Sequence, residues 1–96
     1  MKILRVSAIW CPSCIIMRPI YDEIAKKYNY ESQELDYDFD EDEVNKLEVG
    51  RKLPVAIIYD DNGLELTRIC GEKKINEIEE IIEGLKWNWL KKYYLF

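Results

Sequence analysis

Histidine is absent from this chain of 96 residues. Its absence removes the commonest general base and the commonest side-chain metal ligand at once. Basic residues are few as well: 14 lysines and arginines stand against 19 acidic residues, and the formal net charge is −5. Because no basic stripe exists to displace counterions from phosphates, we expect the protein to bind neither nucleic acid nor an anionic membrane surface.

Long apolar segments are also missing, and none of the apolar runs is long enough to cross a bilayer. Met1 and Lys2 lead directly into Ile3 and Leu4, without the features of a signal peptide. We therefore expect a cytoplasmic protein. The chain holds only three cysteines, too few for a disulfide framework, and a cytosolic disulfide is usually transient and catalytic.

The composition and length of the chain indicate a single folded domain. Apolar residues make up 48% of the chain and charged residues 34%, which is typical of a globular rather than a disordered protein. A chain of this length buries roughly 65% of its unfolded surface on folding, enough for one modest core. No internal repeat or linker interrupts the sequence, so we expect a single domain over residues 1–96, acting as a monomer.

Two cysteines three positions apart stand within the segment Trp10-Cys11-Pro12-Ser13-Cys14, where an apolar strand turns into a helix. The first cysteine would therefore lie at a helix N-terminus, where free N–H groups and the helix dipole favour a thiolate. The second lies one turn on, close enough to attack a mixed disulfide. The pattern predicts dithiol–disulfide chemistry, with Cys11 as nucleophile, Cys14 as the more buried resolving thiol, and Pro12 and Ser13 tuning the potential.

Other roles for the cysteine pair are a zinc half-site, a c-type haem site and a structural motif without activity. A haem site needs a histidine after the second cysteine, where this chain has Ile15. Zinc needs four ligands, and only Cys70 and carboxylates remain. The acidic run over residues 36–43 lacks the glycine and the spaced oxygen ligands of a calcium loop. We therefore expect no metal and no bound cofactor.

Hydrophobic periodicity predicts the order strand–helix–strand–helix–strand–strand–helix. The expected strands cover residues 3–9, 30–37, 54–59 and 64–70, and the expected helices cover residues 11–28, 42–49 and the segment from 74 onward. The second strand has few apolar residues and suits a sheet edge. Pro19 should kink the first helix, and Gly50 should cap the second. In the last helix, Ile75, Ile78, Ile82, Leu85 and Trp89 form one apolar stripe.

This arrangement resembles the thioredoxin superfamily over nearly the whole chain. A Trp-Cys-x-x-Cys motif follows the first strand, and Pro19 lies five residues after the second cysteine. Pro54 opens the third strand after Leu53, where the family has its cis-proline, and Gly71 follows the final hairpin strand. The resemblance implies an α/β, thioredoxin-like fold with a four-stranded mixed β-sheet flanked by three helices.

The same resemblance implies a small thiol–disulfide oxidoreductase that reduces disulfide-containing protein substrates and is itself reduced by a thioredoxin-reductase-type electron donor. Substrates would dock over Trp10, Ile9, Leu53 and Gly71, and a cis bond before Pro54 would let the Leu53 backbone bind an extended strand. Two alternatives stay open. The Cys-Pro-x-Cys order also resembles glutaredoxin, which uses glutathione, and the fold could serve as a non-catalytic binding module.

One position departs from the family pattern. Thioredoxins keep a buried aspartate beneath the cysteine pair, and by spacing Arg5 occupies that place here. The group that takes the proton of Cys14 is therefore open, with Glu23 and water as candidates.

Two further features stand outside the motif. Cys70 is expected to be a small buried hydrophobe, with a regulatory or glutathionylated thiol as the alternative. In the aromatic tail, Trp89 is expected to cover the core. Tyr94 and Phe96 either do the same or form an exposed patch for a partner.

Overall fold

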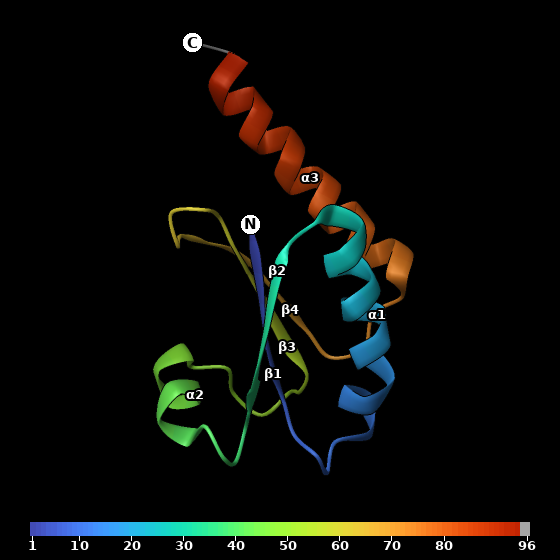
Figure 1. Ribbon diagram of the computed structural model, residues 1–96, viewed down its shortest axis with the longest axis vertical. Coiled ribbons are helices and arrows are strands. Elements are labelled where there is room, and N and C mark those ends of the chain that lie inside the picture. Colours follow the sequence, from blue (N-terminus) through green and yellow to red (C-terminus); the bar gives the residue numbers. More distant parts are fainter. Residues whose placement is uncertain (95–96) are drawn as a thin grey trace.

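A mixed sheet of four strands forms the middle layer of the molecule (Figure 1). Its strands are β1 (Lys2–Ser7), β2 (Glu31–Asp36), β3 (Val55–Tyr59) and β4 (Glu65–Cys70), in the order β2-β1-β3-β4. β2 runs parallel to β1, whereas β3 is antiparallel to β1 and β4 is antiparallel to β3. The structure, a computed structural model, describes the backbone of residues 1–94 and the side chains of residues 1–85.

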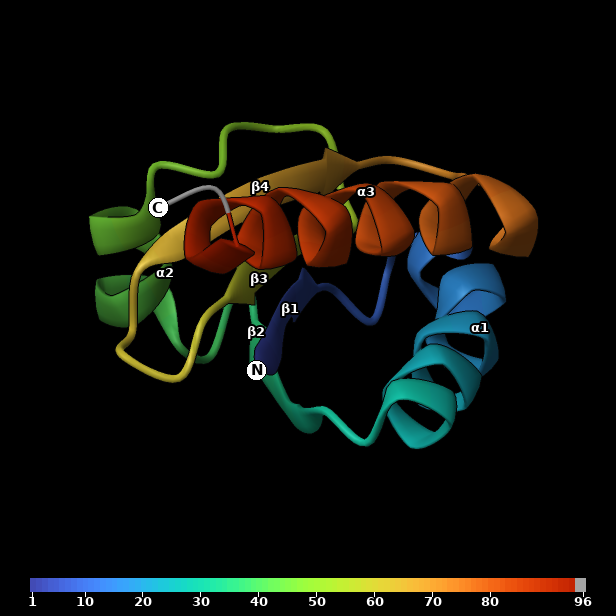
Figure 2. The ribbon, with the colours of Figure 1, turned by 90° about the horizontal axis from the view of Figure 1, so that it is seen from above.

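Three helices cover the sheet: α1 (Pro12–Tyr28), α2 (Glu41–Leu47) and α3 (Ile75–Tyr94). Figures 1 and 2 show α1 and α3 on one face of the sheet and α2 on the other. The observed architecture confirms the expected order of elements and the four-stranded mixed sheet flanked by three helices. Within the part of the chain that the structure describes, no helix is long and apolar enough to span a bilayer.

Alternating side chains of the central strands divide the core into two apolar layers. Neighbouring residues of β1, Ile3 and Leu4, belong to different layers, and so do Ile57 and Ile58 of β3. The layer beneath α1 and α3 includes Met17, Tyr21, Ile24, Ile78 and Ile82. The layer on the α2 side includes Val6, Leu35, Val44, Val55 and both motif cysteines. The cysteine pair is thus part of the core rather than of a surface loop.

Helix α1 begins at the cysteine motif. Pro12 takes the first helical position, where its missing N–H costs no hydrogen bond. The helix continues through Pro19 as one element, so the predicted kink does not divide it. Asn29 ends it in the left-handed conformation, with φ of 55°.

The end of α1 far from the motif is tied to α3. The Lys27 ammonium forms an ion pair of 2.5 Å with Glu79, and the Tyr28 hydroxyl donates a hydrogen bond of 2.9 Å to Glu83. Ile78 and Ile82 of α3 are fully buried, which confirms the predicted apolar stripe over the described side chains. The predictions for Trp89, Tyr94 and Phe96 fall on side chains outside the described residues.

Helix α2 ends earlier than its sequence predicts. Its acidic first turn agrees with the expected helix start. The helix nevertheless ends at Leu47, and Glu48 adopts the left-handed conformation with φ of 53° while its N–H bonds to the Asn45 carbonyl. The prediction that Gly50 caps this helix is therefore wrong, because the last turn closes two residues before the glycine. Gly50, with φ of +72°, lies in the connection to β3.

The predicted hairpin joins β3 to β4. The Asp60 carboxylate accepts hydrogen bonds of 2.9 Å from the backbone N–H groups of Asn62 and Leu64, and Gly63 supplies the positive φ that the turn requires. This hairpin makes β4 an edge strand and places Gly71, which follows it, beside the start of β3.

Candidate active site

The two cysteines of the motif lie side by side at the start of α1. Cys11 is the N-cap residue, and the backbone N–H of Cys14 donates a hydrogen bond of 3.2 Å to the Cys11 sulfur. An N–H group aimed at sulfur stabilises negative charge there. Both thiols are free. Their exposed fractions are 6% for Cys11 and 5% for Cys14, so burial does not separate the two as the sequence predicts.

The electrostatic surroundings do give Cys14 a distinct character. Burial raises the pKa of the Cys14 thiol to about 11, and the hydrogen bond with the Cys11 sulfur and the charges of Cys11 and Glu34 add to this increase. Cys14 is thus a thiol at neutral pH. It must lose a proton before it can attack a disulfide, as expected for a resolving thiol.

Exposed apolar side chains border the motif on its open side. Ile9 is 75% exposed and Trp10 is 59% exposed. The Trp10 indole N–H donates a hydrogen bond of 2.7 Å to Asp38, and its ring meets Tyr37 edge-on at 6.1 Å. Because the loop after β2 fixes the indole while leaving it open to solvent, Trp10 is suited to contact a partner molecule.

Two loops meet beside the motif on this open side. The Leu53–Pro54 peptide bond is cis, as the resemblance implies, and the Pro54 carbonyl accepts a hydrogen bond of 2.8 Å from the Gly71 N–H. The Leu53 side chain is buried, so this residue can offer a partner only its backbone. From the motif, the Ser13 hydroxyl donates a hydrogen bond of 2.8 Å to Glu72, which joins the motif to the same loops.

The backbone conformation and the surroundings of Gly71 favour glycine at this position. Its φ is +74°, which side-chain-bearing residues rarely adopt, and a Cβ atom there would lie 2.9 Å from Cε of Lys52. The structure thus brings the predicted site residues Trp10, Cys11, Cys14, Pro54 and Gly71 to one end of the sheet. Their roles remain predictions.

The position of the family's buried aspartate is occupied by a buried arginine. Arg5 is only 9% exposed, and its guanidinium lies 3.2 Å from Asp22 and 3.4 Å from Glu34. Arg5 and Glu34 are register partners of the parallel strands β1 and β2. Glu23, a candidate proton acceptor from the sequence, is exposed on α1 and does not line the cavity beside Cys14.

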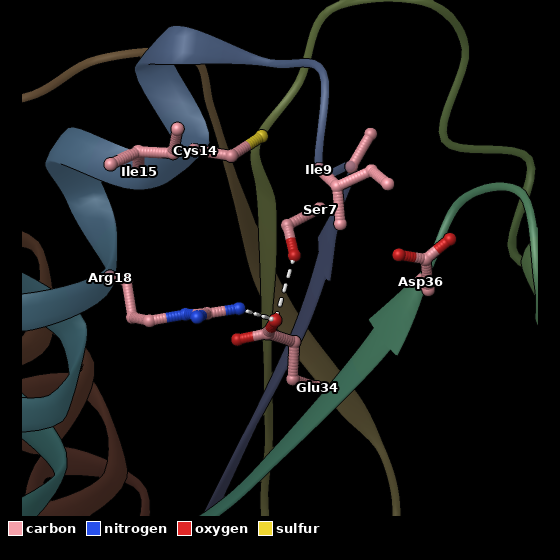
Figure 3. A pocket seen from close by; sticks show the side chains of 8 residues that line it. Ser7, Ile9, Cys14, Ile15, Arg18, Glu34 and Asp36 are labelled. Carbon is pink, nitrogen blue, oxygen red and sulfur yellow. Dashed lines mark hydrogen bonds and ion pairs between the residues drawn. The ribbon is translucent and has the colours of Figure 1, made fainter.

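A cavity of about 160 Å³ borders Cys14 on the side of β2. Figure 3 shows Arg18 of α1 and Ser7 of β1 directed toward the carboxylate of Glu34 in this cavity. Sequence analysis missed these three residues, because only the pairing of β1 with β2 brings Glu34 under α1. Within the described residues, no group of three or more potential ligands could hold a metal ion.

The prediction that Cys70 is buried is wrong. It is the last residue of the edge strand β4, and its side chain is exposed. The sequence gives no sign of this, because the alternation of β4 does not show which strand borders the sheet. Cys70 is therefore a solvent-accessible thiol on the strand that leads to Gly71.

Comparison with known proteins agrees with this geometry. The chain is similar to the reduced thioredoxin pre-protein of Schistosoma mansoni, with 24% identity and a TM-score of 0.75 over 88% of this chain and 77% of that chain. It is similar to thioredoxin-2 of the malaria parasite, with 25% identity and a TM-score of 0.76 over 86% and 81%. With thioredoxin 1 of Thermosipho africanus it shares 23% identity and a TM-score of 0.75 over 96% and 99%.

These likenesses establish the thioredoxin-like fold. A search of curated proteins found no match. The family model for thioredoxin, however, matches residues 1–84, which include the cysteine motif, the cis-proline and the glycine after β4. The chain therefore belongs to the thioredoxin family.

Proposed function

We propose that the protein reduces disulfides of protein substrates through Cys11 and Cys14. Membership of the thioredoxin family supports thiol–disulfide oxidoreduction in general. The observation that carries the specific proposal is the hydrogen bond from the Cys14 N–H to the Cys11 sulfur at the start of α1. This bond stabilises a thiolate on the cysteine that lies next to the exposed Trp10 and the cis-proline loop.

The reaction proceeds in two exchange steps. The Cys11 thiolate attacks one sulfur of the substrate disulfide; a Cys11–substrate bond forms, and the other substrate sulfur leaves as a thiolate that takes a proton from solvent. Cys14 then loses its proton and attacks the Cys11 sulfur. The Cys11–Cys14 disulfide forms, the second substrate thiolate leaves, and two electrons have passed to the substrate.

Substrates dock on the open side of the motif. Ile9 and Trp10 offer exposed apolar surface, while Leu53 and Gly71 offer backbone next to the thiols. An extended segment around a substrate disulfide fits such a surface, because strand addition uses backbone hydrogen bonds with a few apolar contacts. A thioredoxin-reductase-type donor would use the same surface to return the protein to its dithiol form.

Insulin reduction tests the mechanism. The Cys11→Ser variant should show no turnover, and the Cys14→Ser variant should accumulate a mixed disulfide with the substrate. The Cys70→Ser variant is the matched control, since it removes the exposed thiol outside the motif and should keep full activity. Turnover by Cys11→Ser at the rate of the unmodified protein would refute the assignment of the nucleophile.

Two alternatives have direct tests. A glutathione-coupled assay should give little turnover, whereas a glutaredoxin-like enzyme would give substantial turnover. A Cys11→Ser/Cys14→Ser double variant should lose cellular function, whereas a non-catalytic binding module would retain it.

We also propose that the protein acts in the cytoplasm, because a reducing compartment returns such a pair to its dithiol form. Thiol trapping in intact cells should then find Cys11 and Cys14 mostly reduced.

A further inference from the structure

The cavity beside Cys14 has a mostly apolar lining, but it also brings a few polar side chains near the buried thiol. Its walls include Cys14 and Arg18 from α1, Ser7 from β1 and Glu34 from β2. A cavity of about 160 Å³ has room for several water molecules. Because Arg18 and the neighbouring Ile9 are largely exposed, the cavity opens to solvent. A proton that leaves Cys14 therefore has a route to solvent through this cavity.

The carboxylate of Glu34 is fixed in this cavity by three groups. One of its oxygens accepts a hydrogen bond of 3.0 Å from the Ser7 hydroxyl and one of 2.5 Å from Arg18, and the other oxygen lies 3.4 Å from Arg5. Burial acts to raise the pKa of Glu34. The hydrogen bonds from Arg18 and Ser7 and the two arginine charges outweigh burial, so the pKa lies below its ordinary value. Glu34 is thus ionised at neutral pH.

The two members of this ion pair act on Cys14 in opposite directions. The negative charge of Glu34 opposes a thiolate on Cys14, adding to the larger effects of burial and of the hydrogen bond with Cys11. Arg18, one helical turn beyond Cys14, favours that thiolate. The interaction between Arg18 and Cys14 also acts on the arginine. The hydrogen bond to Glu34 contributes most to raising the pKa of Arg18, and the charge of Cys14 adds to this increase. Further charged or titratable groups near the thiol, among the described residues, are Cys11 at the N-cap, Asp36 on the cavity wall and Arg5, which pairs with Glu34.

We propose that the Arg18–Glu34 ion pair adjusts how readily Cys14 loses its proton and thereby changes the rate at which the mixed disulfide is resolved. This inference rests on the proposed function. In the step concerned, the Cys14 thiol gives its proton to water in the cavity, its sulfur bonds to Cys11, and the bond between Cys11 and the substrate breaks. The electron pair leaves on the substrate sulfur, which takes a proton from solvent. Arg18 and Glu34 are positioning residues that act through Cys14.

The inference predicts changes of opposite sign for the two partners. Glu34→Gln removes the charge that opposes the thiolate and leaves Arg18 unpaired, so the pKa of Cys14 falls. Each unit by which the pKa falls gives more Cys14 thiolate at neutral pH, but a more acidic thiol is also a weaker nucleophile. The two effects together should raise the resolution rate at neutral pH by about threefold per unit. At alkaline pH, where Cys14 is fully ionised, the same variant should be slower than the unmodified protein. Arg18→Gln should slow resolution at neutral pH.

An aromatic disulfide, 5,5′-dithiobis(2-nitrobenzoate), at limiting concentration isolates the step. Attack by Cys11 releases the first coloured thiolate, and attack by Cys14 on the resulting mixed disulfide releases the second. Stopped-flow absorbance over the neutral and alkaline range gives the pH profile of each step. All variants carry Cys70→Ser, so that the exposed thiol does not contribute.

The controls match charge and location. Glu31→Gln makes the same change on the same strand outside the cavity, and Arg51→Gln removes an exposed arginine elsewhere; neither should shift the second step. The Glu34→Gln/Arg18→Gln double variant should return the profile toward that of the unmodified protein, which a folding defect would not do. Shifts of equal sign for the two single variants, or none beyond the controls, would overturn the inference. Failure to release even the first thiolate would instead overturn the proposed function.

Discussion

The cysteine pair separates two regions that are built in different ways. On the open side, Trp10 is exposed and the cis-proline loop is joined to Gly71 through backbone hydrogen bonding. On the cavity side, Arg18 and Glu34 form an ion pair between two different elements. The first region is suited to binding an extended chain, and the second to controlling a proton. If both proposals hold, binding and protonation should respond to different substitutions.

The largest expected effect that separates the two regions comes from Trp10→Ala. The substitution removes apolar contact area on the open side, together with the contacts to Asp38 and Tyr37, so kcat/KM for a protein disulfide should fall about tenfold. The rate with a small aromatic disulfide should change little. Leu64→Ala is the control, because Leu64 is similarly exposed on the hairpin. Equal losses with both substrates would show that Trp10 acts on the thiols themselves.

A smaller effect is expected at Gly71. Gly71→Ala should lower the free energy of unfolding by about 1 kcal/mol, because alanine is strained at a positive φ. Gly63→Ala is a matched control, since Gly63 has φ of +83° with no atom near its missing Cβ. Denaturant unfolding should give similar losses for the two variants, while activity toward protein disulfides falls only for Gly71→Ala. Equal activity of the two variants would exclude Gly71 from the docking surface.

The smallest expected effect is a change in the free energy of unfolding at acidic pH, caused by Glu34 on the cavity side. The pKa of Glu34 is lowered in the folded protein, so its ionised form stabilises the fold. This stabilisation is complete above the ordinary pKa of glutamate and is lost as the pH falls through the lower value of the folded state, from about pH 5 downward. The difference in unfolding free energy between the unmodified protein and Glu34→Gln should shrink over that range. Glu31→Gln, the same change on the same strand outside the cavity, is the control.

The open side could largely be predicted from the sequence, because its features are local. The spacing of Cys11 and Cys14 places the pair at a helix start, and Pro54 and Gly71 flank the hairpin at recognisable positions. The cavity side could not be predicted in this way. Glu34 is separated from Arg5 along the chain, and only the parallel register of β1 and β2 makes them partners.

Two of the wrong predictions, those for Gly50 and Cys70, have related causes. Gly50 was expected to end α2, but the helix closes at Leu47 and Glu48 takes the left-handed conformation instead. Cys70 was expected to be buried, but β4 borders the sheet and leaves this residue open to solvent. A helix end and a sheet edge both depend on where neighbouring elements stop. The type of a single residue therefore does not predict either of them.

The two residues between the cysteines lie away from the contacts that join α1 to α3. Pro12 is exposed and Ser13 is half-buried, whereas α1 is fastened to α3 near Lys27 and Tyr28 at its other end. Substitutions at positions 12 and 13 therefore meet little resistance from the core. The sequence predicts that these two positions tune the reduction potential of the cysteine pair, so this short stretch is where a protein engineer would change that potential while keeping the rest of the scaffold.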